Sequence, residues 1–399
     1  MIERRCDIAI AGGGLAGGLI ALALARHRPD IEVVLVEAGT RVGGEHRWSW
    51  FASDLGEAAA ALLAGIARTE WNDGYEVAFP GHSRRLSTGY RSMHSSALAA
   101  AVREALPESA VLAATAVERL ERGGIVLAGD RRITARAVID CRGSAGSRHL
   151  QGGWQVFLGR QLHLGRPHGV ARPVIMDAGV AQLGGYRFVY LLPLSPCDLF
   201  LEDTYYQDSA TLDRPVLAAR LDAYCAAHGW AGEAVAEETG VLPVVTGGDF
   251  AAFQGEHASP GVAVAGARGG FIHPLTSYTL PFAAEAALAV AEHADLPGKD
   301  LAALLAERAR AHWARTALYR LLGTMLLGAA PPEERVRVFE RFYRMPEPLI
   351  ERFYAARSTW ADAVRILAGR PPVSLARAAA ALAGSRPPLL AQPHRELLR

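Results

Sequence analysis

The chain has 399 residues, of which 50% are hydrophobic and 21% charged, so it can bury a large core and extensive disorder is excluded. Its 42 basic and 41 acidic residues give a formal net charge of +1, which argues against nucleic acid as a partner. The four cysteines are too few and too widely spaced for a disulfide scaffold, which favours a reducing cytoplasm.

The first 40 residues alternate between strand and helix patterns. A strand is predicted over 6–11, an Ala- and Leu-rich helix over 15–27 and a second strand over 31–37. This order predicts a right-handed βαβ unit in a parallel sheet. Further along the chain, helices are predicted over 54–68 and 95–106, and short strands over 111–120, 124–127 and 137–139.

The middle of the chain contains a probable hairpin, with strands over 186–192 and 199–205. Helices are predicted over 216–228 and from about 281, and the chain is mostly helical from 300 onward. The pattern predicts an α/β fold with three parts. These are a discontinuous dinucleotide-binding domain over 1–150 and 240–295, a β-rich substrate-binding subdomain over 151–239, and a helical C-terminal region over 296–399.

A glycine-rich turn, GGGLAG over 12–17, joins the first strand to the first helix. Gly12 permits the tight turn, Gly14 lets the backbone approach a pyrophosphate, and Gly17 allows the helix to pack closely on the sheet. The helix N-terminus offers free N–H groups to phosphates, and Glu37 is placed to bind a ribose. The predicted cofactor contacts are Gly12, Gly14, Leu15, Ala16, Gly17 and Glu37.

Three further segments favour FAD over NAD. Residues 41–44 (RVGG), 138–143 (VIDCRG) and 262–266 (VAVAG) resemble motifs of Rossmann-like flavoproteins with two dinucleotide folds. Ala267 stands where most such flavoproteins have an aspartate. The resemblance implies additional cofactor contacts from Arg41, Asp140 and Gly266.

Several segments between about residues 5 and 375 together resemble one family, the flavoprotein-type bacterial lycopene β-cyclases. They are GEHRWSW (44–50), PVIMD (173–177), YRFVYLLPLSP (186–196), FLEDTYY (200–206), GGFIHPLTSYTLP (269–281), RFYRMP (341–346) and RFY (352–354). The resemblance implies an isomerase that closes a ring at each end of lycopene, by way of γ-carotene, to give β-carotene. It also implies reduced FAD without net oxidation, and NADPH as the usual electron source.

The implied reaction begins with protonation of an alkene, which is a very poor base. The acid must therefore be a carboxylic acid kept neutral near pH 7 by burial, and water must be excluded from the resulting cation. Strand alternation over 199–205 places Glu202 on one face and Asp203 on the other. The resemblance assigns proton donation to Glu202, and we expect Asp203 to orient its surroundings. A solvated pair of carboxylates is the alternative from the residues alone.

His273 lies in a turn before a predicted helix, where the flavin ring is expected. It is a catalytic candidate, and a packing or capping histidine is the alternative interpretation. Tyr186, Phe188 and Tyr190 share one strand face and form either a tunnel wall or plain core. The histidines show no spacing typical of a metal site, so no metal is expected.

The region after residue 300 is rich in arginine interleaved with aromatic residues, and no apolar stretch reaches the roughly 20 residues that a spanning helix needs. We therefore expect peripheral binding to the inner face of the cytoplasmic membrane, with a self-contained helical subdomain as the alternative. Two other functions remain open. One is an FAD-dependent monooxygenase or isoprenoid reductase acting on a hydrophobic substrate, and the other is a non-enzymatic carotenoid carrier.

Overall fold

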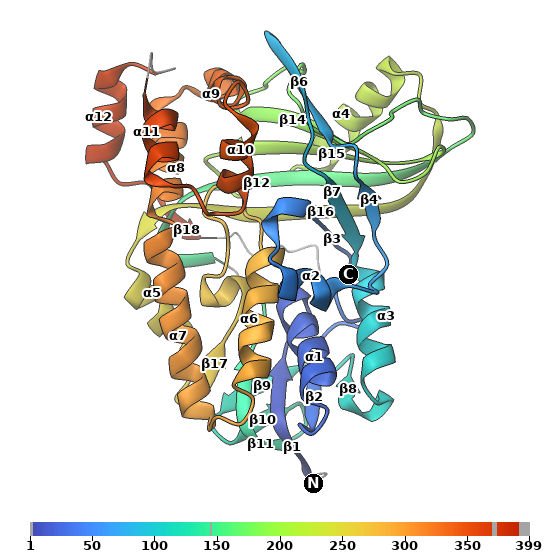
Figure 1. The fold of residues 1–399 in the computed structure, drawn as a ribbon, viewed down its shortest axis with the longest axis vertical. Helices are drawn as coiled ribbons and strands as arrows, with labels where there is room; N and C mark the ends of the chain where they lie inside the picture. Colours follow the sequence, from blue (N-terminus) through green and yellow to red (C-terminus); the bar gives the residue numbers. More distant parts are fainter. Residues whose placement is uncertain (1–2, 144–145, 369–372, 391–399) are drawn as a thin grey trace.

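Two large sheets organise the chain, one in the lower and one in the upper half of Figure 1. The computed structural model describes residues 3–143, 146–368 and 373–390. The predicted helical region over 296–399 is therefore described as far as residue 390, apart from residues 369–372.

The first sheet has a parallel centre and an antiparallel edge. Its strands are β8 (Val111–Leu112), β2 (Val33–Val36), β1 (Glu3–Ala11), β11 (Arg131–Asp140), β10 (Gly124–Leu127) and β9 (Val117–Glu121), with β17 (Val262–Val264) parallel to β11. The apolar run of β1 is fully buried, and the predicted β1–helix–β2 unit is confirmed. The second strand is shorter than predicted, so that Glu37 lies just beyond its end.

Helices cover one face of this sheet, and on the other face apolar residues of β9 and β10 pack with those of β1, β2 and β11. The helices of the chain are α1 (Leu15–His27), α2 (Glu57–Leu63), α3 (Ser95–Ala105), α4 (Arg214–Ala227), α5 (Phe250–His257), α6 (Leu280–Glu292), α7 (Gly298–Arg315), α8 (Ala317–Ala329), α9 (Arg335–Phe342), α10 (Glu347–Tyr354), α11 (Trp360–Leu367) and α12 (Leu375–Ala383). Short 3-10 turns are η1 (Ala52–Asp54), η2 (Glu108–Ala110), η3 (Gly266–Gly269) and η4 (Pro332–Glu334).

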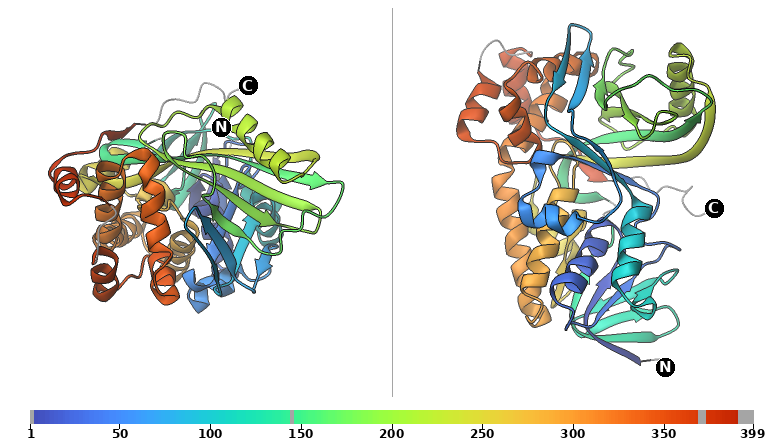
Figure 2. Two further views of the ribbon diagram at one scale, coloured as in Figure 1. Left: turned by 90° about the horizontal axis from the view of Figure 1, so that it is seen from above. Right: turned by 45° about the vertical axis from the view of Figure 1, so that its right-hand side comes forward.

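The second sheet has eight strands, and all neighbours are antiparallel except β13 and β5. Its strands are β16 (Gly232–Gly248), β12 (Gly146–Leu164), β15 (Asp198–Gln207), β14 (Tyr186–Pro193), β13 (Val174–Asp177), β5 (Tyr75–Phe79) and β6 (His82–Leu86), with β18 (Pro388–Leu390) beside β12. The predicted hairpin is β14–β15, slightly longer at both strands. Figure 2 shows the C-terminal helices gathered at one side of this sheet.

The chain crosses between the two sheets more often than the predicted boundaries imply. Strands β5 and β6 lie in the eight-stranded sheet although they fall within the predicted cofactor segment 1–150, and so does the end of β16, which falls within 240–295. The remaining strands of the described residues, β3 (Arg47–Phe51), β7 (Tyr90–His94) and β4 (Thr69–Trp71), form a third sheet. Among the described residues, no helix combines the length and the apolar composition needed to cross a bilayer.

Candidate active site and cofactor site

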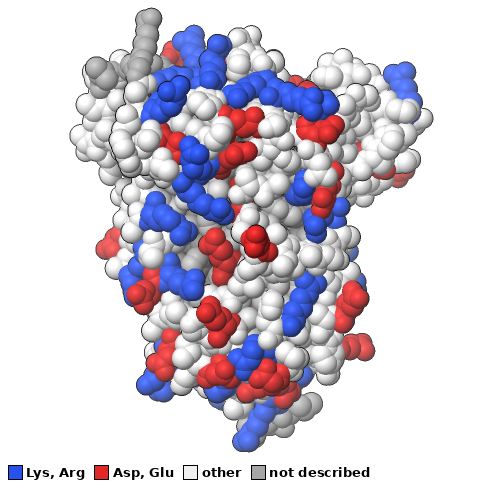
Figure 3. Space-filling view, in the orientation of Figure 1, with Lys and Arg blue, Asp and Glu red and all other residues white. Residues whose placement is uncertain are grey.

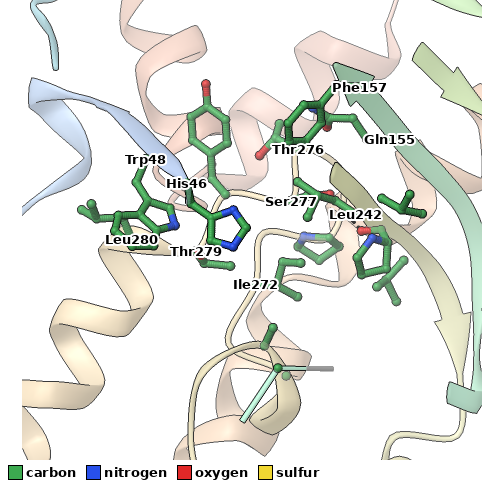
Figure 4. Close-up of a pocket in the computed structure, with 18 of the residues that line it drawn as sticks. His46, Trp48, Gln155, Phe157, Leu242, Ile272, Thr276, Ser277, Thr279 and Leu280 are labelled. Atoms are coloured by element: carbon green, nitrogen blue, oxygen red, sulfur yellow. Dashed lines mark hydrogen bonds between the residues drawn. The ribbon is translucent and has the colours of Figure 1, made fainter. Parts of the chain in front are cut away.

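A cavity of about 450 Å³ draws its walls from the eight-stranded sheet, from β3 and β7, and from the loop that leads into α6. This size is typical of small-molecule sites. In Figure 4, His46 and Trp48 lie on one side of the cavity, and Gln155, Phe157 and Leu242 lie on the other. The lining is mostly apolar and aromatic, which suits a hydrocarbon.

Glu202 is the carboxyl group that strand β15 presents to this cavity. The Oγ1 of Thr204, two residues along the same face, donates a hydrogen bond of 2.7 Å to Oε1 of Glu202. Burial is the main reason that the pKa of Glu202 rises to about 8, and the charge of Glu238 adds to this effect, while Thr204 opposes it. Because a carboxyl group is protonated below its pKa, Glu202 holds a proton at neutral pH.

Asp203 points to the opposite face of β15, away from the residues that line the cavity. Its side chain is fully buried and receives two hydrogen bonds from Arg187, at 2.8 Å from Nε and 3.2 Å from Nη2. The hydroxyl of Tyr205 donates a third, at 3.2 Å, and itself accepts one from Arg220 at 2.6 Å. Asp203 is therefore tied into a buried polar network behind the cavity wall.

His273 is fully buried, and both of its ring nitrogens are engaged. Nε2 lies 3.0 Å from the carbonyl oxygen of Phe353, and Nδ1 accepts hydrogen bonds from the backbone N–H groups of Leu275 and Thr276. Burial lowers the pKa of His273 to about 3, so its ring is neutral. It is not among the cavity-lining residues, although its neighbours Ile272 and Pro274 are. These contacts favour the packing interpretation.

Aromatic side chains from several elements surround the cavity beside Glu202. Tyr190 on β14 lines it, whereas Tyr186 and Phe188 are fully buried in the core. The Tyr186 ring stacks on that of Phe339 with 4.0 Å between centroids, which places these two residues in core packing and not in a cavity wall. Tyr278 also lines the cavity, and its hydroxyl lies 3.0 Å from that of Tyr90 on β7.

Sequence reasoning did not identify several residues that line this cavity. Tyr278 lies within the family segment 269–281, which could have marked it. Glu238 and Leu242 lie on β16, which was not predicted because its sequence mixes glycine, charged and apolar residues without clear alternation. Tyr90 and Phe157 likewise carried no signal of a functional role.

The glycine turn has the shape that a dinucleotide needs. Gly12 has φ of +98°, and a Cβ there would lie 2.8 Å from the Cys141 backbone. A Cβ on Gly17 would lie 1.9 Å from the Gly12 carbonyl oxygen, so only glycine allows α1 to start here. A Cβ on Gly14, in contrast, meets no atom within 4 Å. The open space at Gly14 is where the backbone can approach a pyrophosphate, and these residues fit FAD.

Glu37 lies beside this turn, where the motif is expected to bind a ribose. Its carboxylate accepts hydrogen bonds from the backbone N–H groups of Gly13, at 2.7 Å, and Gly39, at 2.6 Å. These contacts fix the carboxylate beside the first turn of α1, which begins with Leu15 and Ala16. Glu37 is thus held beside the glycine turn by two backbone N–H groups.

The other predicted cofactor residues lie in different settings. Arg41 is exposed and forms an ion pair with Glu45. Asp140 is 2% exposed, and Arg142 donates to it from Nε at 2.9 Å and from Nη2 at 2.8 Å. A Cβ on Gly266 would lie 2.9 Å from the Cβ of Ala16, so this glycine allows η3 to approach the first turn of α1. The late strand and the glycine turn therefore meet.

Two solved structures share this fold. A geranylgeranyl bacteriochlorophyll reductase-like protein from Thermoplasma acidophilum matches with a TM-score of 0.61 and 13% identity, over 93% of this chain and 98% of that one. A flavin-dependent brominase matches with a TM-score of 0.63 and 13% identity, over 91% of this chain and 97% of its own. This likeness shows that the chain has the architecture of the structural class to which these two proteins belong.

Sequence comparison places the chain within this class. Residues 7–380 match the family model described as lycopene cyclase protein. A lycopene beta-cyclase from Paracoccus sp. (strain N81106 / MBIC 01143) is 44% identical over 373 residues, which covers 93% of this chain and 96% of the relative. One from Pantoea ananas is 38% identical over 377 residues, with coverage of 94% and 97%. The chain belongs to the lycopene cyclase family.

Proposed function

We propose that this protein is an FAD-dependent lycopene β-cyclase, an isomerase that converts lycopene by way of γ-carotene to β-carotene without net redox change. The observation that carries the proposal is the placement of Glu202, a carboxyl group whose pKa burial raises, in the wall of an apolar, aromatic cavity. The named relatives support the substrate, and the glycine turn supports the cofactor.

Glu202 starts the reaction by giving its proton to the terminal alkene of the substrate. A C–H bond forms, the adjacent carbon becomes a cation, and the next alkene supplies the electron pair that closes the ring. The ring cation then releases a neighbouring proton, so that atoms and electrons balance. Throughout these steps Thr204 orients the Glu202 carboxyl group, and its hydroxyl remains as a donor to the carboxylate that proton transfer leaves behind.

The aromatic walls protect the cation. The rings of Trp48, Tyr190 and Tyr278 line the cavity with Glu202, and each aromatic face can stabilise a nearby cation by roughly 0.5–2 kcal/mol. Their bulk also keeps water away, which prevents capture of the cation as an alcohol. Asp203 has a positioning role in this proposal, because its ion pair with Arg187 holds β15 in place on the face opposite to Glu202. His273 holds the loop that leads into α6.

The cofactor is proposed to lie along the glycine turn. Gly12, Gly14 and Gly17 would leave room for its pyrophosphate, and Glu37 would bind its ribose. Asp140, at the end of β11, and Gly266, just after β17, would provide further contacts to the cofactor from the neighbouring strand ends. When bound, reduced FAD would supply electron density that stabilises positive charge without being consumed, and we propose NADPH as the source of its electrons.

Pigment analysis separates this proposal from the alternative of a monooxygenase or isoprenoid reductase. The chain would be expressed in a bacterium that accumulates lycopene, and the carotenoids separated by chromatography and weighed by mass spectrometry. The proposal expects ring-bearing products of the same mass as lycopene. Products heavier by oxygen or hydrogen would indicate one of the redox enzymes, and unchanged lycopene would leave a carrier as the function.

We further propose that the protein binds the inner face of the cytoplasmic membrane through α11. Trp360, Val364 and Leu367 are 82%, 57% and 43% exposed, and their spacing places them on one face of this helix. Basic side chains gather over the upper part of the face in Figure 3, where the C-terminal helices lie. Apolar side chains beside arginines suit an anionic bilayer surface.

A second apolar cavity supports this location. It has a volume of about 110 Å³ and is lined by residues of α8–α11, among them Phe342, Ile366 and Leu367. Thr276 lines both this cavity and the larger one that contains Glu202. A linear polyene could therefore pass from a bilayer under α11 toward the carboxyl group that protonates its end.

The membrane proposal predicts that the purified protein sediments with anionic vesicles and less so as salt rises, because the attraction between arginine and lipid is screened. Replacing Trp360 and Val364 together by serine should reduce bound protein about tenfold, because two exposed apolar side chains are lost. Serine substitutions of Val216 and Val235, which are also exposed but lie on α4 and β16, are the matched control. Equal sedimentation of both double variants would contradict the role of α11.

A further inference from the structure

Two carboxyl groups, those of Glu202 and Glu238, stand in one row of the eight-stranded sheet. Glu202 on β15 is paired with Gly159 on β12, and Gly159 is paired on its other side with Glu238 on β16. Residues directly opposite each other on neighbouring strands project their side chains from the same face. Both carboxyl groups therefore project from one face, and both line the larger cavity.

The residue between them is Gly159, and the neighbouring side chains of Phe200 and Glu238 occupy the space that its side chain would need. A Cβ on Gly159 would lie 2.5 Å from a ring carbon of Phe200 and 3.2 Å from Cγ of Glu238. Any other residue at this position would place its side chain between the two carboxyl groups. The glycine thus lets Glu202 and Glu238 share one environment.

Arg47 on β3 supplies positive charge on the Glu238 side of the row. Its guanidinium carbon lies 5.1 Å from the centroid of the Phe200 ring, and it lines the cavity with both carboxyl groups. The Arg47 side chain donates hydrogen bonds to two neutral groups, the side chains of Gln161 at 3.2 Å and Ser92 at 3.4 Å. Burial raises the pKa of Glu238 to about 7, and the charge of Arg47 opposes that rise.

We propose that Glu238 is a positioning residue which, ionised beside Arg47, keeps Glu202 in the protonated form that donates the proton. This inference rests on the proposed function. Two carboxyl groups that share an apolar site cannot readily both ionise, so the pair holds one proton over a wide pH range. Arg47 favours the ionised form of Glu238, and the proton therefore stays on Glu202.

The two carboxyl groups also take back the proton that the reaction releases. The proton of Glu202 becomes part of a C–H bond of the substrate, and the proton released by the ring cation returns to the two carboxylates. Because Arg47 again favours ionised Glu238, this proton settles on Glu202, which is then ready for the second ring. No net proton is consumed over a complete cycle.

Other titratable groups near the pair do not change charge in the range that matters. They are His46, His312, Tyr90, Tyr190 and Tyr278 from the cavity wall, and Asp203 from the other face of β15. Burial raises the pKa values of the three tyrosines and lowers those of the two histidines, so all five stay neutral near pH 8. Asp203 is paired with Arg187. After burial, the charge of Glu238 raises the pKa of Glu202 most and that of Asp203 adds to it, while Arg47 acts on Glu238.

The test is the pH profile of lycopene cyclisation by the FAD-reconstituted protein under reducing conditions. Wild-type activity should fall above about pH 8, where Glu202 loses its proton. In Glu238→Gln this fall should begin at least about one pH unit lower, so that activity at pH 8.5, relative to pH 6, drops about tenfold further. Arg47→Met should also move the fall to lower pH, because Glu238 then ionises less readily and holds the shared proton in place of Glu202.

Glu237→Gln is the matched control. It removes the same charge one residue away, on the opposite face of β16, where Glu237 forms ion pairs with Arg160 and Arg214. Its profile should coincide with that of the wild type. A wild-type protein that forms rings beside a Glu238→Gln variant with an unshifted profile would overturn the role of Glu238 while leaving the proposed function intact.

A second readout does not depend on turnover. The infrared carbonyl band of a protonated carboxyl group, followed in the FAD-bound protein without substrate, should disappear with rising pH at a lower value in Glu238→Gln than in the wild type. It should be weaker in the double variant with Glu202→Gln, where the buried carboxyl group of Asp54, whose pKa burial raises to about 7, still contributes, and the part that is lost belongs to Glu202. Superimposable band titrations of wild type and Glu238→Gln would overturn the inference even if the protein proved not to cyclise lycopene. If Glu238→Gln fails to fold, Arg47→Met carries the same test, with a shift in the same direction.

Discussion

Glu202→Gln is expected to lower lycopene conversion by about 10⁴-fold, near the upper end of the contribution of a general acid. An alkene has no other means of activation in this cavity, and glutamine has no acidic proton to give. The substitution keeps the shape of the side chain and an oxygen that can accept the hydrogen bond from Thr204. It also removes an acid whose ionisation burial disfavours, so the variant should be at least as stable as the wild type.

The measurement is conversion by purified protein with chemically reduced FAD, together with flavin content and a thermal unfolding curve. Asp203→Asn is the comparison variant, because it changes the neighbouring carboxylate on the other face of β15. It should lose far less activity but about 3 kcal/mol or more of stability, since Arg187 is left buried without its partner. Near-normal turnover by Glu202→Gln beside an inactive, stable Asp203→Asn would assign the acid to Asp203 instead.

Gly14→Val is expected to give a folded protein without flavin. The Gly14 backbone has φ of −65°, which valine can adopt, and a Cβ there meets no atom within 4 Å. The valine side chain would instead occupy the space proposed for the pyrophosphate of FAD. Flavin absorbance after purification should fall below a tenth of the wild-type value, while the unfolding temperature of the FAD-free protein stays within a few degrees.

Gly17→Val is the contrasting substitution in the same turn. Its Cβ would lie 1.9 Å from the carbonyl oxygen of Gly12, so β1 and α1 could not keep their present packing. This variant should lose both flavin and stability, whereas Gly14→Val loses flavin alone. Stoichiometric FAD in the Gly14→Val protein would show that the cofactor does not lie along this turn.

The parts of the fold that the sequence predicts best are those specified by local patterns. The helix predicted over 15–27 begins and ends at the observed residues because a glycine turn and an arginine-rich end bound a continuous apolar run. The hairpin β14–β15 was recognisable because two apolar runs flank a short turn with Pro193. Alternation within β15 also separates Glu202 from Asp203 as observed.

What the sequence could not predict depends on contacts between distant segments. Strand β16 is not apolar enough to be recognised, and it forms by pairing along the length of β12. The row of Glu202, Gly159 and Glu238 therefore exists only in the folded sheet. The setting of His273 likewise depends on the carbonyl group of Phe353, 80 residues further along the chain, which no local pattern indicates.

The central claim is ring closure that starts with a proton from the protein and involves no net redox change. Cyclisation of lycopene in heavy water, with reduced FAD, tests it most directly. Each ring should then carry one deuterium bound to carbon, because the Glu202 proton exchanges with solvent before it is transferred, so the β-carotene formed should be about two mass units heavier than the product made in ordinary water. Oxygen uptake should be absent, and NADPH should not be consumed in proportion to product. Rings without deuterium, or products that gain oxygen or hydrogen, would contradict the account.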